Sequence, residues 1–380
     1  MKFLFNKITS KRYFLTLLLF IFINYLFIEK YLSRLNIIPS IVFFGIYIIG
    51  IFIIFYVFKK FNVFQKKYIF WVSCLIIFIA TIFINNYVDG FKLNTDRWSS
   101  THFAIKALLN GKYPYSATDH LNGRTSNLPF LIFINIPFYF LGDVGYFQSF
   151  TLLIFFYFLN IYIDNIKLKI FSLILLVTSL PFWWEIYCKS DILSNSILLI
   201  ITTFYLFHYK KNKTNIFFVG IIFSFMIMTR LVSLIPFFLA FSTHFFTMNI
   251  RKKISFILIV MLIISISFGI VFMNAKNIEM IKHYNPFELQ NRQIPFYLSL
   301  IFIIVPIIYS FFIKNIKALI YNCIFFLSIP ILTSFLWRVI IHGWNNSLYN
   351  SYTDISYFNL LLPFIVFILA YDFKSILDNK

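Results

Sequence analysis

The sequence predicts an all-α protein, a polytopic bundle of transmembrane helices that forms a single integral membrane domain over residues 1–380. Of its residues, 61% are hydrophobic and only 12% are charged, which is too little charge to cover the surface of a soluble domain. Apolar runs of about 17–22 residues recur, and this length matches a hydrocarbon core of ~30 Å. A transmembrane β-barrel would instead show alternating polarity and many more glycines than the 10 present.

The net charge of +20 does not indicate a nucleic-acid partner, because much of it sits in short clusters at the ends of apolar runs. Such clusters are typical of cytoplasmic loops. The basic start of the chain therefore predicts a cytoplasmic N-terminus, and the long first run without a small-residue cleavage site predicts a span rather than a signal peptide. The three cysteines, Cys74, Cys188 and Cys323, are scattered and indicate neither a disulfide framework nor a metal site.

Taken in order, the apolar runs predict about eleven to thirteen spans. The runs cover 13–28, 37–58, 68–87, 128–141, 146–163, 168–184, 192–207, 216–228, 231–247, 254–272, 295–313, 318–336 and 357–371. The third span delivers a loop at 88–127 to the outer face, and further outer loops are expected at 273–294 and 337–356.

The parity of these runs is inconsistent at one place. The loop at 88–127 and the charged segment at 185–191 should both be outside, yet three apolar runs separate them. One of the three is therefore not a full span. The run at 128–141 is the best candidate, since about fourteen residues are too few for an untilted span.

The loop at 88–127 contains the longest polar interval of the chain. Residues 98–110 predict a short helix with His102 and Lys106 on one face and apolar residues on the other, ended by Gly111. Such a helix is expected to lie flat in the membrane interface. The ionisable residues of the interval are Asp96, Arg97, His102, Lys106, Lys112, Asp119, His120 and Arg124. The turn Tyr113-Pro114-Tyr115 that follows is expected at headgroup depth.

Ionisable groups near a membrane are costly and are usually retained for function. Asp96 is either a catalytic base or an N-cap for the predicted helix, with Arg97 as a surface neighbour. Glu185, Lys189 and Asp191 either bind substrate or pair with one another at a helix start, and pairing is the favoured interpretation.

Three further positions on the outer side are candidates. Arg230, at the tip of a short hairpin, is either a phosphate ligand or a side chain that snorkels to the interface, with a phosphate ligand favoured. His283 and Arg292 flank Asn285-Pro286-Phe287 in a loop that either faces a phosphate or is simply solvated. Asp354 precedes the last span. A bundle could bring these groups together in one outward-facing cavity.

The order of these motifs resembles the polytopic C-type (GT-C) glycosyltransferases, and within them the bacterial mannosyltransferase-like members that use polyprenyl-phosphate sugars. An aspartate in the first large outer loop is followed by an amphipathic helix, a G-K-Y-P-Y segment and an N-L-P entry into the next run. The matching residues are Asp96, Gly111, Tyr113, Pro114, Tyr115 and Pro129, with Arg230 and Pro236 at a later hairpin tip. The chain departs from the family in having extra spans before the aspartate loop and no large C-terminal soluble domain.

The resemblance implies transfer of a sugar from a polyprenyl-phosphate donor to a hydroxyl of a glycan, lipid or protein acceptor, at the outer face of the bacterial cytoplasmic (inner) membrane. Asp96 would be the base. Positive charge for the leaving phosphate would come from Arg230, Lys189 or Arg292, or from a divalent cation held by carboxylates. The substrate-binding candidates are Arg97, His102, Tyr113, Tyr115, Glu185, Lys189, Asp191, Arg230, His283, Arg292 and Asp354.

Three other functions remain open from the sequence. A transporter or lipid flippase would need polar residues in mid-span and helices broken near the midplane, and no inverted pair of broken helices is visible. A polymerase or ligase of lipid-linked glycans would also use outer-face arginines. A non-enzymatic membrane component is the third alternative. None of these functions involves nucleic acid, and membrane lipids surround the protein in all of them.

Overall fold

The computed structural model describes residues 2–32, 39–61, 66–209, 215–291 and 295–377. Within these ranges the regular structure is helical, apart from one isolated antiparallel bridge between Thr118 and Arg124. The prediction of an all-α fold is therefore confirmed.

Twelve of the helices make up the bundle. They are α1 (Lys2–Phe27), α2 (Ser40–Lys60), α3 (Lys67–Tyr87), α6 (Tyr146–Tyr162), α7 (Ile166–Val177), α9 (Ile192–Phe207), α10 (Ile216–Ile227), α11 (Leu234–Thr247), α12 (Ile250–Phe272), α15 (Phe296–Tyr309), α16 (Ile316–Leu348) and α17 (Leu362–Leu377). Short elements fill the connections at one end. These are α4 (Arg97–Leu109), α5 (Pro129–Phe140), α8 (Leu180–Tyr187), α13 (Ile278–His283), α14 (Pro286–Asn291) and the 3₁₀ helices η5 (Leu231–Ser233) and η7 (Ile355–Leu360).

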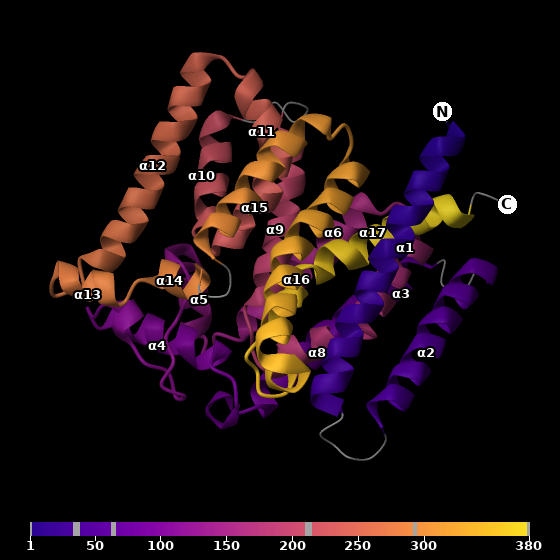
Figure 1. The fold of residues 1–380 in the computed structure, drawn as a ribbon, viewed down its shortest axis with the longest axis horizontal. Helices are drawn as coiled ribbons and strands as arrows, with labels where there is room; N and C mark the ends of the chain where they lie inside the picture. Colours follow the sequence, from indigo (N-terminus) through magenta and orange to yellow (C-terminus); the bar gives the residue numbers. More distant parts are fainter. Residues whose placement is uncertain (1, 33–38, 62–65, 210–214, 292–294, 378–380) are drawn as a thin grey trace.

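The connecting elements gather at one end of the molecule, which we call the loop end. Figure 1 shows α4, α5, α8, α13 and α14 in its lower half, whereas both chain termini lie toward its upper right. The helix α12 begins at the top of this view, with Arg251, Lys252 and Lys253 in its first turn, and ends beside α13 at the loop end. The basic cluster at the start of α12 therefore lies at the opposite end of this helix from the loop end of the molecule.

Six helices are long and apolar enough to cross a membrane, or seven if α7 and α8, which meet at a 62° bend, count as one broken span. The six are the segment Lys11–Leu32, the helices α2, α3, α12 and α16, and the segment Ile355–Phe373. The other predicted spans correspond to apolar helices of only 10–17 residues. The structure therefore supports a helical membrane protein, and the count of eleven to thirteen spans stays a prediction.

The helix α5 resolves the parity problem in the sequence. Just before it, the Asn127 amide nitrogen donates to the Thr101 hydroxyl of α4 at 3.0 Å. Just after it, Asp143 accepts from the indole nitrogen of Trp98, also on α4, at 2.7 Å. Since both ends of α5 are bonded to the same helix, α5 enters and leaves at the loop end and does not cross the bundle. The suspicion that 128–141 is not a full span is confirmed.

Over the first half of the expected outer loop at 337–356 the chain is helical, because α16 continues across a kink at Gly343 to Leu348. That this segment lies outside the membrane stays a prediction. Trp337 and Ile340, which are 53% and 78% exposed, extend the apolar surface of the helix past the end of the predicted run at 336. The helical backbone is interrupted only at Gly343, whose φ of +77° is accessible mainly to glycine.

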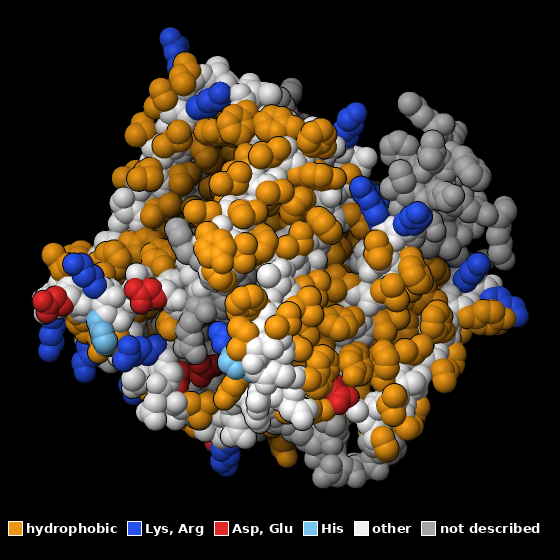
Figure 2. Space-filling view, in the orientation of Figure 1, with side chains coloured by type: hydrophobic (Ala, Val, Ile, Leu, Met, Phe, Trp, Pro, Cys, Tyr) orange, Lys and Arg blue, Asp and Glu red, His pale blue; other side chains and the backbone are white. Residues whose placement is uncertain are grey.

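Burial is unequal across the bundle. The core is built around α17, whose apolar window is 89% buried, while α2 and α12 are only 11% and 17% buried. Figure 2 shows hydrophobic side chains covering the flank of the bundle, with lysines and arginines mostly at its edges. An apolar flank of this extent is what a lipid environment requires.

A second apolar cluster fixes α4 to the end of α12. Tyr113 and Tyr115 are 0% and 1% exposed and pack in this cluster with Trp98, Ile105 and Val271. Both rings therefore face the protein interior and not lipid, and the headgroup depth expected for the Tyr113-Pro114-Tyr115 turn stays a prediction.

The basic clusters predict which end faces the cytoplasm, and cysteine labelling tests this prediction. Thr118 at the loop end and Lys252 at the start of α12 are both exposed. We expect Thr118→Cys to react with an impermeant maleimide in intact cells, and Lys252→Cys to react only after permeabilisation. The native thiols of Cys74, Cys188 and Cys323 are buried, so the parent protein is the matched control. The opposite labelling pattern would invert the topology.

Candidate functional site

The first charged contact at the loop end joins α4 to η7. The Arg97 guanidinium forms an ion pair with Asp354 and donates to the Ser356 hydroxyl at 3.2 Å. It also lies 5.5 Å from the centre of the Tyr357 ring. Residues about 260 positions apart in the chain are thereby held together, and Asp354 enters the site as a partner of Arg97.

Asp96 occupies the N-cap position of α4, but its side chain makes no capping hydrogen bond. Among the residues that the structure describes, no ion pair or hydrogen bond of this carboxylate is found. A Cβ placed on Gly123 would lie 3.3 Å from Asp96 Oδ2 and 2.6 Å from Asp119 Oδ2, so only glycine lets the loop pass this close to both carboxylates. Asp96 thus lies at the edge of the cluster with a carboxylate that bonds to none of the described residues.

Arg230 is the centre of a buried network. Its Nη2 donates to Asp191 Oδ1 at 2.6 Å and to Asn127 Oδ1 at 2.9 Å, and Asn127 Nδ2 closes the ring by donating to Asp191 Oδ2 at 2.6 Å. The side chain is 2% exposed as a residue, so it does not snorkel. Its Nε and Nη1 have no partner among the described residues. Buried donors without partners are rare and commonly mark a missing polar ligand.

Glu185 is fully buried and bonds to the last helices of the chain. Its carboxylate accepts from Asn359 Nδ2 at 2.8 Å and from the Leu193 backbone N–H at 3.0 Å. The Gln148 amide donates to the backbone oxygens of Glu185 and Ser190, each at 2.6 Å. These bonds fix the turn between α8 and α9 that carries the acidic residues.

The expected pairing of Glu185, Lys189 and Asp191 with one another is wrong. Lys189 has a positive φ of 51°, which directs its side chain away from the other two, and its ammonium forms an ion pair with Asp143. Asp191 pairs with Arg230 instead. The three residues are close in sequence, but the turn sends them to three different neighbours.

The electrostatics of the cluster favour its cations. Burial alone would lower the pKa of Arg97, yet the neighbouring acidic groups raise it by more, so the pKa of this guanidinium lies above its ordinary value. The groups that raise it are Tyr357, Asp96, Asp191 and Glu185. The site thus places the guanidiniums of Arg97 and Arg230 among several carboxyl groups.

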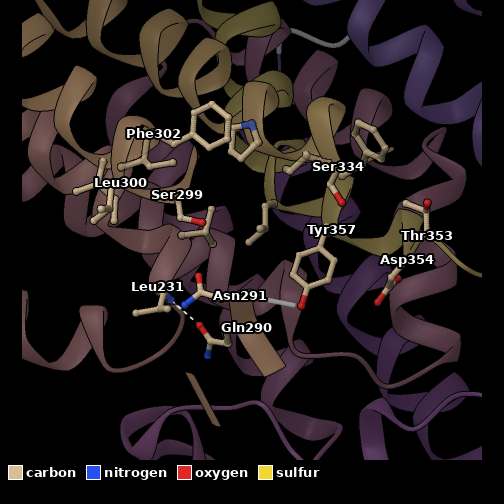
Figure 3. A pocket seen from close by; sticks show the side chains of 17 residues that line it. Leu231, Gln290, Asn291, Ser299, Leu300, Phe302, Ser334, Thr353, Asp354 and Tyr357 are labelled. Atoms are coloured by element: carbon tan, nitrogen blue, oxygen red, sulfur yellow. Dashed lines mark hydrogen bonds between the residues drawn. The ribbon is translucent and has the colours of Figure 1, made fainter. Parts of the chain in front are cut away.

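An apolar cavity of about 300 Å³ opens beside this cluster. Its walls come from α11, α14, α15, α16 and η7, with Leu300 and Phe302 on one side, and Figure 3 shows the polar groups of Gln290, Asp354 and Tyr357 gathered toward the other side. Leu231, which directly follows Arg230, also lines the cavity. The cavity is therefore lined by Asp354, the ion-pair partner of Arg97, and by the residue next to Arg230, but by neither arginine itself.

Gln290 joins the wall of this cavity to the aspartate loop. Its Oε1 accepts from the Leu231 backbone N–H at 2.8 Å, the bond drawn in Figure 3, and its Nε2 donates to the Ser126 carbonyl at 2.6 Å. The loop at 88–127, the hairpin tip at 230 and the loop at 273–294 therefore meet at one place.

The structure brings together half of the residues that the sequence proposed. Asp96, Arg97, Glu185, Asp191, Arg230 and Asp354 share the cluster described above. His102 and Lys189 border a different cavity, Tyr113 and Tyr115 line neither of the two cavities, and His283 is exposed on α13. Arg292 lies outside the described residues.

Several site residues were missed from the sequence. Three of them, Asn127, Asp143 and Asn359, bond to charged side chains, and the other two, Gln148 and Gln290, bond to backbone groups nearby. Their one signal in the sequence is that each is polar and lies next to or inside an apolar run. Amides at such places lack water and must find a protein or ligand partner.

A divalent cation does not fit the described residues well. Within them, no three His, Cys, Asp or Glu side chains come together in an arrangement suited to a metal ion. Asp191 and Asp354 are each committed to an arginine. Positive charge in this cluster comes from guanidinium groups.

Comparison of this chain with protein-family models, with curated proteins and with solved structures found no match.

Proposed function

We propose that this protein is a membrane glycosyltransferase that moves a sugar from a polyprenyl-phosphate donor to an acceptor hydroxyl at the outer face of the bacterial inner membrane. The observation that carries the proposal is the apolar cavity lined by Asp354, the partner of Arg97, and by Leu231, which follows Arg230; the Nε and Nη1 atoms of Arg230 have no partner among the described residues. Such a cavity suits a ligand with a hydrocarbon tail and an anionic head.

The donor has two parts, and each has a matching surface. The segment of the isoprenoid chain next to the phosphate would occupy the cavity between α11, α15 and α16, and the rest would extend into lipid. The phosphate would receive hydrogen bonds from Nε and Nη1 of Arg230, the donors that no described residue satisfies. These two donors lie on different edges of the guanidinium, so each would give one charge-assisted hydrogen bond.

The reaction needs one base and one stabiliser of the leaving group. The acceptor oxygen forms a bond to the anomeric carbon while the bond from that carbon to the phosphate oxygen breaks. The acceptor proton passes to the carboxylate of Asp96, which makes no capping hydrogen bond within the part of the chain that the structure describes. The bond electrons leave with the phosphate, whose added charge the Arg230 guanidinium stabilises.

One observation favours a lipid flippase as the second candidate. The helices α7 and α8 meet at a 62° bend, and the fully buried Glu185 follows that bend. A broken helix that leads to a buried charge is a feature of many transporters. A flippase would move the lipid-linked sugar intact, whereas a transferase releases the lipid phosphate.

The test is incubation of the purified protein in lipid nanodiscs with a panel of polyprenyl-phosphate hexoses labelled in the sugar, together with candidate glycan, lipid and protein acceptors. We expect release of polyprenyl phosphate and transfer of label for one donor of the panel. Translocation of intact donor in proteoliposomes, with no release of lipid phosphate, would instead support the flippase.

A further inference from the structure

A second cavity of about 400 Å³ lies at the loop end, separate from the apolar cavity in its lining residues. It is bordered by the ends of α3 and α6, by one face of α4 and by the turn after α8. The lining residues that matter here are Asn85, Phe91, His102, Tyr146 and Lys189. The lining is rich in polar groups and aromatic rings, unlike that of the cavity in Figure 3.

The charges in this cavity are already compensated. The ammonium of Lys189 is paired with Asp143, and the Asp89 carboxylate lies 3.9 Å from the Lys92 ammonium. Burial and, to a smaller extent, Lys106 lower the pKa of His102, which keeps its imidazole neutral at pH 7. No uncompensated cation among the described residues of this lining is available for an anionic ligand.

An unpaired amide borders the same space. Asn85 is 1% exposed, and neither its Nδ2 nor its Oδ1 has a hydrogen-bond partner among the described residues. The His102 Nδ1 is likewise buried without a partner within that part of the chain. The Gly145 backbone packs against this amide, since a Cβ there would stand 2.3 Å from Asn85 Nδ2. A buried amide with both of its functions unused costs stability unless a ligand completes it.

We propose that this cavity binds a neutral saccharide unit. A sugar hydroxyl both donates and accepts a hydrogen bond, and the Asn85 amide offers one partner for each. The exposed Phe91 ring, together with the partly exposed Tyr146 ring, provides an apolar surface for the C–H face of a sugar ring. A few fixed polar groups among aromatic side chains are the usual composition of a small-molecule site.

The position of the cavity suggests how a bound saccharide would be used. Trp98 and His102 border it, and Trp98 follows Asp96 and Arg97 directly at the start of α4. Lys189 lines it, whereas Asp191, two residues later, belongs to the Arg230 network. A saccharide held here would be the acceptor. That role rests on the proposed function, while binding itself does not.

The test is equilibrium binding to the full-length protein in nanodiscs, because maltoside detergents would compete as sugars. Saturation-transfer NMR with glucose, galactose, mannose and N-acetylglucosamine at millimolar concentration measures binding without any donor. Inorganic phosphate serves as the anionic rival. We expect binding of at least one neutral sugar and none of phosphate.

Two variants locate the site. Asn85→Leu removes both amide functions and breaks no described protein hydrogen bond, so we expect an unchanged or raised Tm and affinity reduced at least about tenfold. Val88→Trp places a bulky ring in the cavity from its partly exposed rim and should reduce affinity similarly. The matched control is Asn195→Leu, because Asn195 is also a buried, unpaired amide but does not line this cavity.

The proposal is overturned if no sugar of the panel binds, if phosphate binds in place of a sugar, or if both Asn85→Leu and Val88→Trp bind sugar as the parent does. Its failure is distinguishable from that of the proposed function. Donor cleavage without saccharide binding would remove this site alone. Saccharide binding without release of lipid phosphate from any donor would remove the transferase and leave the site.

Discussion

Asp96→Asn is expected to fold and insert normally, to retain donor binding and to lose turnover by roughly 10²–10⁴-fold, the usual contribution of a positioned general base. In this structure the substitution changes the chemistry of one side chain without breaking a described contact. The Asp96 side chain caps no helix N–H, so asparagine disturbs no described contact of the carboxylate and removes only the ability to accept a proton. The measurements are the rate of polyprenyl-phosphate release and, separately, the affinity for the donor.

The control for this experiment is Asp164→Asn, an equivalent change at an exposed aspartate between α6 and α7. It should transfer sugar at the parental rate. An Asp96→Asn protein that keeps near-normal turnover would end the case for this residue as base. The next candidates would then be Asp354, Asp191 and Glu185, the other carboxyl groups of the cluster.

Arg230→Ala is expected to abolish measurable transfer and to destabilise the protein. The substitution leaves the buried Asp191 carboxylate without its cation, and breaking a buried ion pair in this way typically costs about 3–5 kcal/mol. Arg230→Lys should keep part of both properties, because an ammonium can pair with Asp191 but lacks the fork that also reaches Asn127 and a phosphate. The measurements are Tm in nanodiscs, donor affinity and turnover.

A double variant separates the structural role of Arg230 from its functional one. Arg230→Met combined with Asp191→Asn removes both charges and should recover much of the lost Tm. Under the phosphate-ligand hypothesis the double variant stays inactive and does not bind donor. Recovery of donor binding together with stability would show that Arg230 only neutralises Asp191.

The helical bundle was predictable because the apolar runs are long and uninterrupted. The run at 192–207 coincides with α9, and the run at 68–87 begins one residue after α3. The limits of the prediction came from connections. Periodicity carries no information on whether a twelve-residue helix such as α5 crosses the bundle, because that depends on the bonds that Asn127 and Asp143 make with α4.

The gathering of charged loops at one end was also predictable, because charged side chains are costly inside apolar runs and therefore lie in the segments between them. The pairing of those charges was not. Sequence proximity favoured contacts among Glu185, Lys189 and Asp191. In the structure Lys189 pairs with Asp143, Asp191 pairs with Arg230, and Glu185 accepts a hydrogen bond from the amide of Asn359. The φ of +51° at Lys189 and the path of η7 determine these contacts, and neither can be predicted from the residue types.

The lengths of the helices have a consequence for the surrounding membrane. The poorly buried α2 and α12 have 21 and 23 residues, whereas α10 and α11, which flank Arg230, have 12 and 14. At ~1.5 Å per residue the inner pair falls short of a ~30 Å hydrocarbon core by on the order of 10 Å. A bilayer whose thickness matches α2 and α12 is thicker than α10 and α11 are long. Beside α10 and α11 the bilayer therefore has to become thinner or admit water. Hydrophobic mismatch would thus bring the head of a membrane-anchored substrate down to the buried arginines.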